Sequence, residues 1–116
     1  IRVYPGLEVN KQEAEAFCKQ SWIVQPNSNR MGIRLEVHSQ SPAKTNVKLA
    51  AVESHCSNPV WDGVIQWTGS ELIVLHRYRA TLGGYARVLE VNREDLNRLA
   101  QFKAGELVRF KLLELK

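Results

Sequence analysis

The residues with the clearest potential for chemistry form a short polar string, residues 28–35, between two apolar runs. Arg30 and Arg34 in this string carry planar, permanently charged guanidinium groups, which suit carboxylate and phosphate anions. Asn29 can both donate and accept hydrogen bonds, and Gly32 allows a ligand to approach the backbone closely. Two interpretations remain open from these residues: an anion-binding or carbonyl-binding corner, or a loop whose arginines brace neighbouring turns.

A second group of candidate residues lies in the C-terminal half of the chain. Gly83 and Gly84 precede Tyr85, which predicts either a tight turn or a pocket wall of backbone groups with the tyrosine hydroxyl as donor. Gln66 follows an apolar run, and it is either a polar group of a pocket or a solvated strand residue. His76 can titrate near neutral pH, but the pattern does not place it in a pocket.

The elements that must position these residues are short. Asn10 and Glu13 form a capping-box pattern, which predicts an amphipathic helix over residues 11–20. Cys18 falls on its apolar stripe, so we expect a buried, unreactive thiol. Asn92 is expected to cap a second short helix. Alternating or continuous apolar residues predict strands over 22–24, 33–37, 64–67, 72–75 and 85–91, and a final strand follows the turn at residues 104–105. Many short strands and two short helices indicate a β-rich barrel.

Composition restricts the class of protein. A chain of 116 residues with 44% hydrophobic and 24% charged residues is expected to form a single globular domain over residues 1–116. It has no run of about 20 apolar residues, so no membrane association is expected. The net charge of +4 is scattered along the chain, so nucleic acid is not expected as a partner.

Cysteine and histidine usage gives no sign of a metal site or a disulfide framework. Cys18 and Cys56 are the two cysteines, and the adjacent pair His55–Cys56 lacks further ligands at metal-binding spacing. The expectation is therefore no metal, two free thiols and a cytoplasmic location.

Four segments in order, residues 28–35, 63–66, 83–85 and 95–110, resemble the biotin-dependent carboxyltransferase-like family, which includes allophanate hydrolase subunit 2 and the C subunit of 5-oxoprolinase. Residues 1–6 are similar to the start of the second half of such proteins. The resemblance implies a mainly β fold, a cyclophilin-like β-barrel with two short flanking helices. It also implies that the chain is a C-terminal piece of a longer subunit, and that a homologous second subunit of the same system is its partner.

The resemblance implies amide-type chemistry on a small carboxylate or urea-like ligand: carboxyl transfer to a urea-like nitrogen, or 5-oxoproline ring opening coupled to ATP. The arginines would hold the anion, the two amides would orient it, and the tyrosine would close the pocket. No cofactor is expected in this domain, although the resemblance allows ATP or biotin in the full complex. No catalytic residue is assigned. The expected substrate-binding residues are Asn29, Arg30, Arg34, Gln66, Gly83, Gly84 and Tyr85.

Two departures from the family pattern keep an alternative open. Tyr78 and Ala80 stand where relatives carry an acidic residue and a glutamine, so a potential general base and an orienting amide are both missing. The fragment alone is therefore expected to lack turnover. The alternative function is a non-catalytic interaction or regulatory module, of the kind associated with control of a histidine kinase. The residues do not distinguish allophanate from urea or 5-oxoproline.

Overall fold

The computed structural model describes residues 1–28, 32–38, 58–59, 61–76, 82–83 and 85–113. Within them the chain forms two helices and ten strands. The helices are α1 (Lys11–Cys18) and α2 (Arg93–Leu99). The strands are β1 (Arg2–Pro5), β2 (Ser21–Val24), β3 (Gly32–Val37), β4 (Asn58–Pro59), β5 (Val64–Trp67), β6 (Leu72–Leu75), β7 (Leu82–Gly83), β8 (Ala86–Val91), β9 (Leu107–Arg109) and β10 (Lys111–Leu112).

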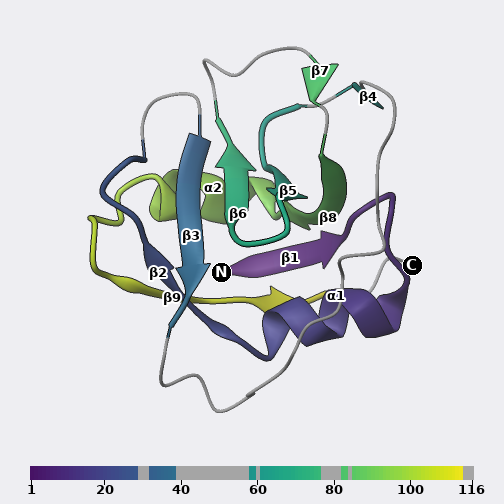
Figure 1. Cartoon of the computed structure of the whole chain (residues 1–116), viewed down its shortest axis with the longest axis horizontal. Coiled ribbons are helices and arrows are strands. Elements are labelled where there is room, and N and C mark those ends of the chain that lie inside the picture. Colours follow the sequence, from purple (N-terminus) through teal and green to yellow (C-terminus); the bar gives the residue numbers. More distant parts are fainter. Residues whose placement is uncertain (29–31, 39–57, 60, 77–81, 84, 114–116) are drawn as a thin grey trace.

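Eight of these strands form one sheet in the order β10-β1-β8-β5-β6-β3-β2-β9. The two strands at its ends, β9 and β10, are separated in the chain only by Phe110, which is buried. The sheet therefore curls into a nearly closed barrel, as the sequence predicted, and one short segment supplies both of its edges. In Figure 1 the small ribbon of β4 and β7 lies at one end of the molecule and α1 lies at the opposite end.

The predicted final strand is corrected by this arrangement. The alternation of Val108, Phe110 and Leu112 suggests one continuous strand. The chain instead breaks at Phe110, because β9 pairs with β2 while β10 pairs with β1 in the parallel sense. The side chains still alternate between buried and exposed across Phe110, so the sequence pattern does not show that the strand is interrupted there.

An aromatic cluster fills the barrel interior on the side of α1. Phe17 lies 6.2 Å from Trp22 and 5.3 Å from Trp67 between ring centroids, and the two tryptophans are 6.1 Å apart. Phe17 and Trp22 are fully buried. The indole Nε1 of Trp22 donates to the Phe17 carbonyl at 2.9 Å, which satisfies its polar atom inside the core. This cluster fixes α1 against the sheet.

Both predicted helices are present with the predicted caps. The Asn10 side chain accepts from the Glu13 backbone at 2.8 Å, and the Glu13 carboxylate accepts from the Asn10 backbone at 3.0 Å. This reciprocal pair begins α1. The Asn92 side chain accepts from the Glu94 backbone at 3.0 Å and begins α2. Cys18 packs half-buried against the core, and burial raises the pKa of its thiol to about 12.

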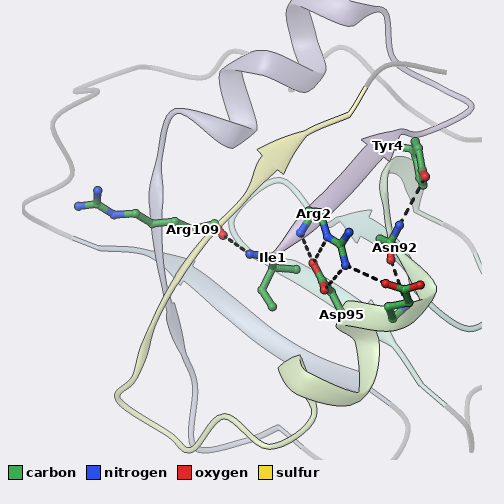
Figure 2. Close-up of polar contacts among 7 residues, drawn as sticks. Ile1, Arg2, Tyr4, Asn92, Asp95 and Arg109 are labelled. Atoms are coloured by element: carbon green, nitrogen blue, oxygen red, sulfur yellow. Dashed lines mark hydrogen bonds and ion pairs between the residues drawn. The ribbon is translucent and has the colours of Figure 1, made fainter. Parts of the chain in front are cut away.

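A buried carboxylate ties the first strand to the second helix. Asp95 is 4% exposed, and its Oδ2 accepts from the Arg2 backbone at 2.7 Å and from Arg2 Nε at 3.0 Å. The Arg2 Nη2 donates to the other carboxylate oxygen at 2.9 Å, so the guanidinium faces Asp95 in a two-pronged contact (Figure 2). The side-chain hydrogen bonds from Arg2 hold the pKa of Asp95 well below its usual range.

Candidate functional site

The sheet register brings two of the predicted site residues into one row. Arg34 in β3 is paired with Ile73 in β6, Ile73 with Gln66 in β5, and Gln66 with Arg87 in β8. Paired residues of neighbouring antiparallel strands project from the same face of a sheet. Arg34, Ile73, Gln66 and Arg87 therefore lie side by side on the face opposite the aromatic cluster, and we call them the polar row.

Gln66 is the part of the polar row with unused hydrogen-bonding capacity. Gln66 is 4% exposed, so the alternative prediction of a solvated strand residue is wrong. Its Nε2 has no hydrogen-bond partner among the described residues. A register shift between Ile65 and Gln66, a β-bulge, lies immediately before it. Bulges re-aim side chains and often lie beside sites. The arrangement leaves a buried amide donor ready for an acceptor oxygen.

A glycine turn fixes where β5 begins. Gly63 has φ +92°, a backbone conformation that favours glycine, and its N–H donates to the Leu75 carbonyl at 2.9 Å. Its carbonyl accepts from the Val91 backbone at 2.8 Å. These two bonds join β5 to both of its neighbours just ahead of Gln66, so the position of the amide depends on this turn.

The two arginines of the polar row are both held by carboxylates. Arg34 Nη1 donates to Glu71 Oε1, and this ion pair is partly buried. Arg87 Nε donates to both oxygens of Glu8, at 2.7 and 3.0 Å, and the Arg87 side chain is only 13% exposed. Each positive charge in the row is therefore matched by a negative charge from a connecting segment of the chain.

The remaining predicted site residues are only partly described. Asn29, Arg30 and Gly84 lie outside the described residues, as do Tyr78, Ala80, His55 and Cys56. Gly83 belongs to β7, where it pairs with Asn58 of β4. Tyr85 comes immediately before β8 and is 49% exposed. Their joint role in a pocket with Arg34 and Gln66 stays a prediction.

Sequence reasoning missed Arg87 of the polar row and the two carboxylates, Glu8 and Glu71, that bind its arginines. A signal for Arg87 exists, because it is a charged residue between the apolar Ala86 and Val88 of a predicted strand. The two carboxylates carry no such signal, since Glu71 lies in a predicted turn and Glu8 precedes a helix.

The chain matches a known protein family along nearly its whole length. Residues 1–112 match the family described as carboxyltransferase domain, subdomain A and B. The chain belongs to this family. The carboxyltransferase domain is 30% identical over 114 residues to the C subunit of 5-oxoprolinase from Escherichia coli K12, covering 95% of this chain and 34% of that protein. It is 29% identical over 101 residues to a urea amidolyase of Saccharomyces cerevisiae, covering 85% of this chain and 6% of that protein.

Solved structures agree with this assignment. The crystal structure of the Kluyveromyces lactis urea amidolyase aligns with a TM-score of 0.75 and 25% identity, over 98% of this chain and 7% of that one. A crystal structure of TTHA0988 aligns with a TM-score of 0.73 and 24% identity, over 96% and 21% respectively, and supports the fold alone. The chain thus spans about a third of the length of the 5-oxoprolinase C subunits that it matches. Neither helix in the described residues has the length and apolar character needed to cross a bilayer.

Proposed function

We propose that this carboxyltransferase domain supplies binding groups for an amide or urea-like substrate, in a site that is completed by further domains of its own subunit and by a partner subunit. The relatives named as the 5-oxoprolinase C subunit and as urea amidolyase support this substrate class. 5-Oxoproline, urea and allophanate all carry an amide-type carbonyl oxygen. A reaction at that carbonyl places negative charge on the oxygen, which a preorganised donor stabilises.

The observation that carries the proposal is the buried Nε2 of Gln66, which has no hydrogen-bond partner in the part of the chain that the structure describes. A buried donor without an acceptor costs about 1–3 kcal/mol, and a ligand carbonyl at hydrogen-bond distance removes that cost. Gln66 is 4% exposed and lies next to a β-bulge, whose extra residue is Val88 of β8. The amide therefore has both the capacity and the fixed position of a ligand-binding group.

Arg34 is proposed to bind the carboxylate of ligands that have one, such as 5-oxoproline or allophanate. Its guanidinium donates to Glu71 through Nη1, and its side chain is 36% exposed. The other donors of the fork can bind a second carboxylate from the solvent side. Tyr85, exposed beside β8, is proposed to close over the ligand.

A non-catalytic interaction module is the second candidate, and the charge matching in the polar row favours it. Arg34 and Arg87 are each neutralised by a glutamate of this chain, so this row attracts anions less strongly than free arginines would. A module of this kind would bind a protein surface without dependence on the Gln66 amide.

The test is ligand binding by variants of Gln66, with the partner subunit present. Gln66→Met keeps the length of the side chain and removes the amide. Gln101→Met is the matched control, because Gln101 is exposed in the turn after α2. We expect 5-oxoproline or urea to raise the Tm of the parent and of the control, and to leave Gln66→Met unchanged. Equal ligand-induced shifts in all three proteins would contradict the proposal and favour the interaction module.

A further inference from the structure

A second row of paired residues crosses three strands on the same face as the polar row. Tyr4 in β1 is paired with Glu90 in β8, and Glu90 with Val64 in β5. Trp61 lies before β5, and its Nε1 donates to Glu90 Oε1 at 3.1 Å. The indole is therefore hydrogen-bonded to Glu90, the middle residue of this row. Together these residues form one wall of a pocket of about 230 Å³ that also contacts Leu7.

The pocket is apolar with a single unmatched charge. Leu7 is 68% exposed and Trp61 is 37% exposed, so two large apolar side chains are open to solvent at this place. Arg87 also lines the pocket, but Glu8 binds its guanidinium through both carboxylate oxygens. Glu90 has no cationic partner among the described residues, and only the indole of Trp61 donates to it. The charge left for a ligand is therefore negative.

These properties select the ligand by size and by charge. Pockets for drug-sized molecules are about 300–1,000 Å³, so 230 Å³ suits one side chain rather than a whole cofactor. An apolar stem can lie against Leu7 and Val64 while its cationic head reaches Glu90 and the face of Trp61. Lysine fits better than arginine, because Glu90 Oε1 already accepts from Trp61 and a two-pronged guanidinium contact would need both oxygens.

The surroundings indicate that the lysine belongs to a peptide. A larger, polar cleft of about 990 Å³ adjoins the pocket and shares Tyr4, Trp61 and Glu90 with it. Asn92 and Asn97 line this cleft. The Asn92 amide is engaged within the chain, because its Oδ1 accepts from the Glu94 backbone and its Nδ2 donates to the Tyr4 hydroxyl (Figure 2). Asn97 is exposed. The Asn97 amide offers both a donor and an acceptor, as an extended peptide backbone requires.

We propose that the pocket between Trp61, Leu7 and Glu90 binds a lysine side chain from an extended segment of a partner protein. Gln66 does not line this pocket, so the inference is independent of the proposed substrate site.

The experiment titrates the ¹⁵N-labelled chain with acetyl-Gly-Lys-Gly-amide and follows the Trp61 indole resonance by NMR. The comparison peptide carries norleucine, which has a similar stem and no charge. We expect the lysine peptide to shift the resonance to saturation and to bind at least about fivefold more tightly than the norleucine peptide. Equal binding of the two peptides, or no shift with either, would overturn the proposal.

Two variants and one further ligand complete the design. Glu90→Gln retains an acceptor for Trp61 and removes the charge, so it should weaken lysine binding by about fivefold or more. Glu36→Gln removes the same charge from an exposed position on β3 and should bind as the parent does. Loss of binding in both variants would indicate a general charge effect and refute the pocket. Binding of n-butylammonium as tight as that of the peptide would refute the peptide partner.

Discussion

Replacing Gln66 by methionine is expected to stabilise the unliganded domain. The two side chains have similar length and volume, so the substitution should not open a cavity or overfill the site. It removes an amide whose Nε2 is buried and has no partner among the described residues. An unsatisfied buried polar group costs about 1–3 kcal/mol, and we therefore expect the free energy of unfolding to rise by about 1–2 kcal/mol.

The expected change is large enough to measure by thermal melting. An unfolding entropy of about 2.1 cal/mol/K per residue gives roughly 0.24 kcal/mol/K for a chain of 116 residues. The Tm of Gln66→Met should then lie about 4–8 °C above that of the parent. Gln101→Met changes an exposed side chain and should stay within about 0.5 kcal/mol of the parent.

A Gln66→Met variant less stable than the parent by about 1 kcal/mol or more would refute this reasoning. Such a loss would mean that the amide makes native hydrogen bonds, so that it is a structural group of the sheet. A stabilised variant that also loses ligand binding would identify a residue kept for function at the expense of stability.

Asp95→Asn should lower the Tm by several degrees at pH 7, because it weakens the two-pronged contact with Arg2. The pKa of Asp95 is lower in the folded than in the unfolded protein, where it is about 3.9. The stabilisation is therefore fully present above about pH 4 and is lost progressively as the pH falls below that value. The Tm values of parent and variant should approach each other below about pH 4. Cys18 should react with a thiol reagent at pH 8 only after unfolding, since burial raises its pKa to about 12; rapid labelling of the native protein would contradict this. Gly6→Ala should destabilise the domain by about 1–3 kcal/mol or more in denaturant unfolding, because its Cβ would lie 2.2 Å from the Arg87 carbonyl oxygen.

The features that could be predicted from the sequence depend on residues close together in the chain. The capping box of Asn10 and Glu13 spans one helical turn, and Asn92 bonds to the backbone two residues later. The hairpin of β5 and β6 closes over four residues, where Thr68 and Glu71 exchange the turn hydrogen bonds. Local chemistry of this kind leaves a recognisable pattern.

The features that could not be predicted depend on distant partners. β1 contains Pro5 and has no clear alternation, and it becomes a strand because β8 and β10 pair with its two sides. In the polar row, the motifs pointed to Arg34 and Gln66, but Glu71 lies 37 positions from Arg34, and Glu8 lies 79 positions from Arg87. The sequence does not indicate that these charges are matched, because only the closed barrel brings the carboxylates to the arginines.

The most direct test of the central claim is the NMR spectrum of the Gln66 side-chain amide during addition of 5-oxoproline or urea, with the partner subunit present. A hydrogen bond from Nε2 to the ligand carbonyl should move the Gln66 amide proton resonances downfield in step with ligand saturation, while those of Gln101 remain fixed. A ligand that saturates the protein and leaves the Gln66 resonances unchanged would contradict the account, because the carbonyl would then bind elsewhere.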